Sequence, residues 1–260
     1  MVAPTLSAPG VIDITATSAR PQVTLTYSAA WTPAEITTAL WLDADDPDTI
    51  ILSGSDVISI HDKSASSVTF SQDIGTPTYS NGRVIFDGVT NMASDNSVNL
   101  GDVSALFLVF GSNTKATQRV LSQGVFTNGT SVWELLCSAF GYVSYRINGT
   151  NTYRVDSVSD YPTDGSISLY VGVNNAPMSI RFNGEEQDTT PSPAAQDTNT
   201  EPVYLGGTPD GSQLNGEFCE SIVVVDPTPE LIEKIEGYLA WKWGLEANLP
   251  SGHPYENAAP

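Results

Sequence analysis

The stretch IEGYLAWKWGL, residues 235–245, carries the one convincing amphipathic helix pattern in this sequence. The pattern starts a few residues earlier, where Thr228 is a suitable N-cap and Pro229 suits the first helical position. Gly244 is suited to end the helix in the left-handed conformation. These signals predict a helix over residues 229–243, the only long helix that we expect.

The two tryptophans of this stretch, Trp241 and Trp243, fall on different faces of the predicted helix. We therefore expect the helix to lie between a sheet and the tail LPSGHPY, residues 249–255, as a structural element. The alternative is that its tryptophans form a binding site.

Strand signals follow one another through most of the remaining chain. Short apolar or alternating runs, separated by Gly, Asn, Asp and Pro, are ALWLDA, VISIHD, SVTFSQ, RVIFDG, ALFLVFG, RVLSQGVF, VWELLCS, YVSYRING, SISLYVGVN, MSIRFNG, PVYLGG and FCESIVVVD. Asn148-Gly149 and Asn183-Gly184 are strong hairpin signals. This pattern predicts an all-β protein with two packed sheets, a sandwich or jelly roll. Residues 186–202 are predicted to form a polar surface loop.

Residues 1–30 differ from the rest of the chain. Two alternating runs, residues 11–14 and 23–27, flank a polar turn and predict a hairpin or an extended arm. A two-stranded hairpin is marginally stable alone, so this arm should lie on its own domain or on a neighbouring subunit. We divide the chain into an N-terminal arm, residues 1–30, and one sandwich domain, residues 31–260.

The charge balance excludes several classes of partner. Ten Lys and Arg against 30 Asp and Glu give a formal net charge of −20. Nucleic acids and anionic membranes both attract basic surfaces, so neither is an expected partner. No apolar run is long enough to cross a membrane, and residues 1–10 lack the pattern of a secretory signal. Cys219 should be a buried core residue, whereas its pairing with Cys137 stays open.

The order of several motifs is similar to that of a known family. Between residues 37 and 255 the chain carries, in this order, the motifs LWLDADD, HDKS, FDG, LFLVFG, MSIRFNGEE, YLGG, LNGEFCESIVVVD and IEGYLAWKWGLEANLPSGHPY. This sequence resembles the concanavalin A-like, laminin-G-type jelly-roll domains of tailed-bacteriophage virion proteins and bacterial surface proteins. The resemblance implies a jelly roll whose end is closed by the helix that follows the last long strand.

No catalytic set is evident. Glycosidases of this fold carry E-x-D-x-x-E on a strand, and the nearest match, Glu186 and Asp188, continues to Pro191 and falls in the predicted loop. Glu220 lies in an apolar run, where burial could raise its pKa, and we expect it to bond backbone groups. The acidic run at residues 43–48 favours an aspartate-capped turn over a calcium site. We predict no enzymatic activity, no cofactor and no metal.

Tyrosines in the middle of the chain are the candidate sugar-binding residues. Tyr142, Tyr145 and Tyr153 could form an aromatic platform. Alternation along a strand sends neighbouring residues to opposite faces, so ordinary core tyrosines are the competing interpretation.

These observations predict a non-enzymatic structural protein on the surface of a bacteriophage virion, assembled in the host cytoplasm. A capsid decoration protein anchored by its N-terminal arm is the main hypothesis, with capsid or tail proteins as partners and a homo-oligomeric state. The alternative is a carbohydrate-binding adhesin of the phage tail or a bacterial lectin-like module that binds host glycans. Head or tail placement and the identity of any glycan stay open.

Overall fold

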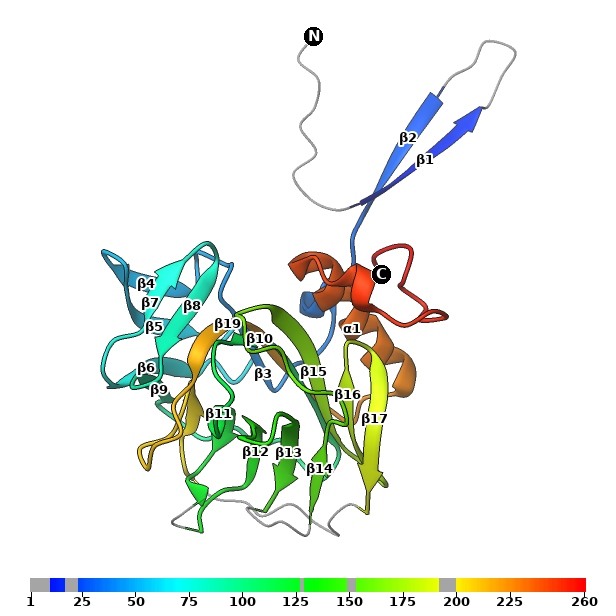
Figure 1. Cartoon of the computed structure of the whole chain (residues 1–260). Coiled ribbons are helices and arrows are strands. Elements are labelled where there is room, and N and C mark those ends of the chain that lie inside the picture. Colours follow the sequence, from blue (N-terminus) through cyan, green and yellow to red (C-terminus); the bar gives the residue numbers. More distant parts are fainter. Residues whose placement is uncertain (1–9, 17–22, 127–128, 149–152, 192–199) are drawn as a thin grey trace.

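The computed structural model describes residues 10–16, 23–126, 129–148, 153–191 and 200–260, with side chains from residue 30 onward. Within these residues the chain is built almost entirely of antiparallel strands, with one long helix near its C-terminus (Figure 1). The helices described are too short or too polar to span a membrane.

Strand pairing divides the large sheet into two layers that are joined at one side. The first layer contains, in spatial order, β17 (Glu185–Thr190), β16 (Met178–Phe182), β15 (Ile167–Asn174), β10 (Ser104–Ser112) and β19 (Asn215–Val225), then β3 (Leu40–Asp43) and β8 (Arg83–Asp87) on different halves of β19.

The second layer runs through β14 (Arg154–Asp156), β13 (Val143–Ile147), β12 (Trp133–Cys137), β11 (Gln118–Gln123), β18 (Val203–Leu205), β9 (Asn91–Ser94), β6 (Thr69–Ile74), β5 (Asp56–His61) and β4 (Ile50–Ser53). The short strand β7 (Thr78–Ser80) pairs with both β5 and β8 and so connects the layers.

The strand β10 shows why the sequence contains a run with no polar alternation. Its nine residues are all buried. Leu106 and Leu108 face the core between the two layers, whereas Phe107 and Val109 face a second core under the helix. Because both faces of this strand are covered, both sets of alternating residues must be apolar.

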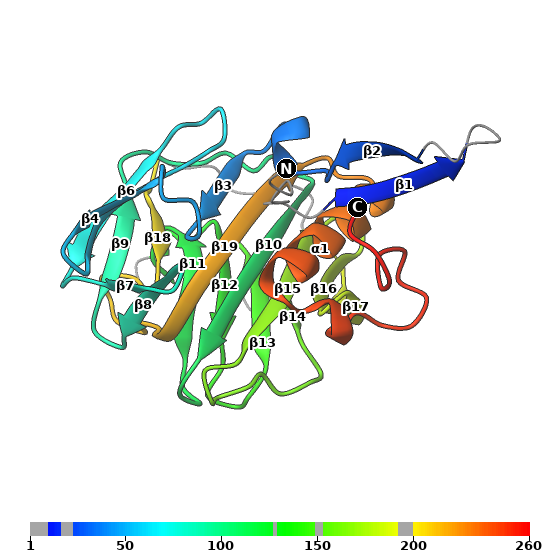
Figure 2. The ribbon, with the colours of Figure 1, turned by 90° about the horizontal axis from the view of Figure 1, so that it is seen from above.

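The helix α1 (Pro229–Trp243) has the predicted bounds, and Thr228 caps it by accepting a hydrogen bond from the backbone N–H of Leu231. Gly244 ends it with a φ of 69°. Ile235 and Leu239 belong to the second core. The helix therefore covers the outer face of β10 and β15 (Figure 2), rather than closing an end of the sandwich as the family resemblance implied.

The C-terminal tail lies on α1, as expected from the two faces of the helix. Trp241 donates its indole N–H to the carbonyl of Tyr255 at 2.8 Å, and the Tyr255 ring packs against Gly237. The 3-10 helices η1 (Pro33–Glu35) and η3 (Glu246–Asn248) flank this layer.

Residues 185–190, expected to lie mostly in a loop, form the edge strand β17. The Asn183-Gly184 hairpin pairs this strand with β16 despite its polar composition.

Cys219 is buried as expected, and both cysteines are free. Of the two forms considered for the arm, β1 (Gly10–Ala16) and β2 (Val23–Ala29) form a hairpin in a separate two-stranded sheet.

Candidate functional site

Four motifs that are distant in the sequence meet at one place. Trp41 and Asp43 come from β3, Lys63 from the segment after β5, Glu220 from β19 and Lys242 from α1. The register aligns Glu220 opposite Asp43 on the paired strands, and Lys242 near the end of α1 contacts both carboxylates. A single polar cluster therefore contains residues from the motifs LWLDADD, HDKS, FCESIVVVD and YLAWKWGL.

Glu220 is the centre of this cluster. Its side chain is completely buried and accepts hydrogen bonds from the indole N–H groups of Trp41 and Trp243, both at 2.8 Å. The Tyr238 hydroxyl lies 3.3 Å away, and the Lys242 ammonium lies 2.7 Å away. The expectation of backbone partners for Glu220 was wrong, because a long carboxylate on a buried strand is reached by side chains from both β3 and α1.

Asp43 extends the cluster towards the surface. Its carboxylate accepts from Lys242 at 2.6 Å and from Lys63 at 3.0 Å, and Lys63 also contacts Asp46 at 2.6 Å. Acidic and basic groups therefore alternate from the core outward. Burial opposes the charge of each lysine, but their acidic neighbours outweigh it and raise the pKa of Lys63 and of Lys242.

Burial and the nearby Asp43 charge raise the pKa of Glu220, as its apolar sequence context suggested. Burial, followed by the Glu220 and Asp43 charges, also raises the pKa of Tyr238. Strongly perturbed groups of this kind are concentrated at functional sites, although structural ion-pair networks also produce them.

The acidic run at residues 43–48 forms the turn that the sequence favoured. The backbone N–H of Asp45 donates to Asp43, and that of Asp48 donates to Asp46. Among the residues described, no group of three or more metal-ligating side chains is positioned to hold an ion. The side chains that could have bound calcium instead cap the turn and pair with lysines.

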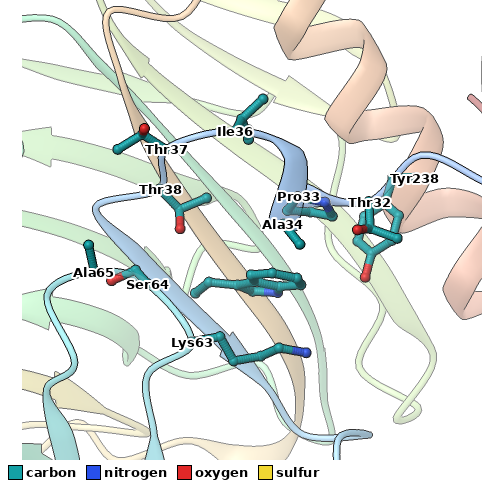
Figure 3. A pocket seen from close by; sticks show the side chains of 11 residues that line it. Thr32, Pro33, Ala34, Ile36, Thr37, Thr38, Lys63, Ser64, Ala65 and Tyr238 are labelled. Carbon is teal, nitrogen blue, oxygen red and sulfur yellow. The ribbon is translucent and has the colours of Figure 1, made fainter.

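A surface pocket of about 600 Å³ lies beside this cluster (Figure 3). Tyr238, which is half-buried, and Trp41, which is only 6% exposed, contribute aromatic surface, and Lys63 lies along one side. Hydroxyl groups are supplied by Thr32 and Thr37, among others, and Thr37 is exposed. The pocket thus combines apolar ring surface with several hydrogen-bonding groups, which is the composition of a small-molecule site.

Trp41 is fixed from three directions. Its indole N–H is bound to Glu220, its backbone N–H donates to Asp62 at 2.8 Å, and the Lys63 ammonium lies 4.2 Å from the centre of a ring. Asp62 is itself held by Ser64. The aromatic wall of the pocket is therefore preorganised by buried polar contacts.

This geometry does not suit acid–base chemistry. A catalytic carboxylate needs access to substrate, whereas Glu220 has no exposed surface and its oxygens face four donors. The Glu186 and Asp188 pair lies on the edge strand β17, far along the sheet from Glu220, and Pro191 still occupies the position of the third acid.

The three tyrosines predicted from the sequence do not share one surface. Tyr145 is fully buried in the core against Gly172, and so has no surface with which to contact a sugar. Tyr153 is half-buried and packs against the same core. Tyr142 is half-buried as well, and its ring stacks on the exposed Phe140. Alternation along a strand could not show which tyrosines face outward, because Tyr142 and Tyr153 each lie just before a strand rather than within one.

Trp41 and Lys63 were not chosen from the sequence as site residues. The motifs LWLDADD and HDKS were the available signal, since they carried the family resemblance. Their convergence depends on the pairing of β3 with the distant strand β19, which no local pattern reveals.

The two antiparallel layers and their jelly-roll strand order make this an all-β jelly-roll protein. No protein-family model matches the chain, and no curated protein sequence matches it. Solved structures do share the fold. Domain 4 of AbnA, a GH43 extracellular arabinanase from Geobacillus stearothermophilus in complex with arabinotriose, matches with a TM-score of 0.53 and 12% identity, covering 72% of this chain and 91% of that domain.

Binding domains of botulinum neurotoxins are similar as well. The binding domain of neurotoxin DC in complex with SialylT has a TM-score of 0.54 and 10% identity, covering 78% of this chain and 52% of that one. The serotype D domain in complex with N-acetylneuraminic acid has a TM-score of 0.53 and 12% identity, covering 77% and 50%. This chain therefore spans about half the length of the neurotoxin domains, and these similarities establish the jelly-roll fold alone.

Proposed function

We propose that this protein is a non-catalytic carbohydrate-binding domain that holds a glycan in the pocket beside Trp41. The pocket is the observation that carries the proposal. An aromatic ring fixed by Glu220 lines the same pocket as the hydroxyl groups of Thr32 and Thr37. A sugar presents both C–H faces and hydroxyl groups, so it matches such a wall of apolar and polar groups.

The cost of the underlying cluster supports a functional role. Removing the charges of Glu220, Asp43 and two lysines from water carries a large desolvation free energy. Well-packed apolar residues often stabilise a core equally well. The cluster fixes the position of Trp41 and Tyr238, which both line the pocket. Preorganised side chains lower the entropic cost of binding a ligand.

The solved neighbours add support from their ligands. The arabinanase domain was solved with arabinotriose, and a neurotoxin binding domain was solved with N-acetylneuraminic acid. Binding of sugars is thus compatible with this architecture, although fold does not fix function.

A glycan array followed by calorimetry tests the proposal. Ala65 is exposed and lines the pocket, so Ala65→Trp should fill it without disturbing the cluster beneath. Ala247 is exposed in η3 and lies outside the pocket lining, which makes Ala247→Trp the matched control. We expect array ligands to lose binding to the first variant only. Equal binding by both variants would exclude this pocket as the site.

The virion placement is a second proposal, which rests on the sequence resemblance. In this proposal the protein lies on the surface of a phage particle as a homo-oligomer, and the arm, residues 1–30, contacts capsid or tail proteins. Gold-labelled antibody on intact particles tests it: label on the head supports decoration, label at the tail tip supports an adhesin, and unlabelled particles contradict both.

A further inference from the structure

We propose that the surface around Tyr142 is a second binding site, separate from the Trp41 pocket, for a sugar that bears a carboxylate. This surface is formed by the loop of residues 138–142, by β14 and by the loop of residues 157–161. The two loops are joined by a hydrogen bond from the backbone N–H of Tyr161 to the carbonyl of Gly141, at 2.8 Å.

An aromatic pair forms the apolar part of this surface. The rings of Phe140 and Tyr142 lie nearly parallel, 15° apart, with their centres 6.1 Å from each other. Phe140 is 78% exposed, so most of its ring is open to solvent. Parallel, accessible rings offer a flat surface on which the C–H face of a pyranose can pack.

Arg154 supplies the charged part. Its guanidinium carbon lies 5.1 Å from the centre of the Tyr142 ring, and one terminal nitrogen donates to the Tyr142 hydroxyl at 2.6 Å. Its Nε donates to Asp156 at 2.7 Å, and Ser144 donates to the same carboxylate oxygen. The planar guanidinium is thus held beside the ring with its Nε and one terminal nitrogen engaged, and its other terminal nitrogen can donate charge-assisted hydrogen bonds to a ligand carboxylate.

Two further cations lie close by. Arg146 lies opposite Arg154 across the β13–β14 pair and is paired with Glu134 at 3.2 Å, although its buried Nε has no hydrogen-bond partner. Like charges opposite each other on paired strands are destabilising; Glu134 and Asp156 already offset part of this repulsion, and an anionic ligand would offset more of it. Lys115 pairs with Asp160 at 3.1 Å beside Gly141, and both side chains of this pair are well exposed.

The charged and aromatic groups of this surface favour some anionic ligands over others. A nucleic acid would bring many phosphates towards a chain with a net charge of −20, which opposes its binding. A sugar with a single carboxylate needs one guanidinium and one ring face, and both are present at Arg154 and Tyr142. Uronic acids and sialic acids share this chemistry.

The test uses two acidic probes with matched neutral partners. Trigalacturonic acid is compared with its methyl ester, and 3′-sialyllactose is compared with lactose, by NMR titration of the full chain. Phe140→Ser and Arg154→Gln remove the ring platform and the cation. Val89→Ser, which alters a side chain that is 64% exposed at a distant turn, is the matched control for the first. Circular dichroism verifies that each variant is folded.

We expect at least one acidic probe to bind, with signals of residues 138–142 and 154 shifting most. Loss of a charge-assisted contact should weaken binding about tenfold or more in Arg154→Gln, and Val89→Ser should bind as the parent does. Equal binding of an acid and its neutral partner, an unchanged affinity in Phe140→Ser, or no shift with either acid would overturn the proposal. Ala65→Trp should leave this binding intact, which separates the outcome from that of the Trp41 pocket.

Discussion

Glu220 holds three aromatic side chains through one carboxylate, and its substitution tests this arrangement. In Glu220→Gln the amide group would face indole N–H groups and the Lys242 ammonium, so a donor would oppose a donor. Breaking a buried pair of this kind costs about 3–5 kcal/mol of unfolding free energy, measured by urea denaturation. Glu217→Gln is the control, since its partly exposed pair with Arg83 should contribute no more than ~1 kcal/mol. Similar losses in both variants would contradict a special role for Glu220.

The pH dependence of the Glu220 contribution should be opposite to that of an ordinary ion-paired acid. Burial, and then Asp43, raise the pKa of Glu220 in the folded state. The folded state therefore binds this proton more tightly than the unfolded chain, whose Glu pKa is about 4.3. The resulting stability is fully present below that pH and is lost as pH rises through the folded pKa. The stability difference between the parent and Glu220→Gln should thus shrink from acidic to neutral pH; a difference that grows would contradict the raised pKa.

At the scale of the element, Gly237 tests how the tail packs on α1. In an ordinary helix interior, Gly→Ala stabilises by about 1 kcal/mol. Here a Cβ at Gly237 would lie 2.6 Å from the Tyr255 side chain, so Gly237→Ala should destabilise the protein. In a Tyr255→Ala background the space is free, and the same substitution should become neutral or stabilising. Thermal unfolding of the four proteins in this cycle measures the sign, and stabilisation by Gly237→Ala in both backgrounds would show that the tail does not pack there.

The elements also show what the sequence could predict. The helix α1 was predicted with its observed bounds because Thr228, Pro229 and Gly244 are strong local signals. Each of the twelve strand signals corresponds to a strand, whereas β4, β7, β9, β14 and β17 were missed because they are short or largely exposed. Such strands are defined by pairing with neighbours rather than by their own side chains. For the same reason the site was not predicted, since it depends on long-range pairing of β3 with β19.

At the scale of the whole molecule, the arm and the sandwich should be separable. Trp31 begins the packed part of the chain: its backbone N–H donates to the carbonyl of Pro260, and its ring packs edge-on against Tyr238. A chain of residues 31–260 should therefore keep the thermal midpoint of the full chain, because those contacts are retained. Its oligomeric state, measured by light scattering, should change if residues 1–30 mediate assembly. A large fall in the midpoint would show that the arm belongs to the folded domain.

The most direct test of carbohydrate binding is ¹⁹F NMR of the full chain labelled with 5-fluorotryptophan, titrated with the strongest neutral ligand from the glycan array. Trp41 lines the pocket, whereas Trp133 is fully buried between the two layers. Binding in the pocket predicts that the Trp41 signal shifts in a saturable manner while the Trp133 signal stays constant. A ligand that binds without moving the Trp41 signal would contradict the proposed site.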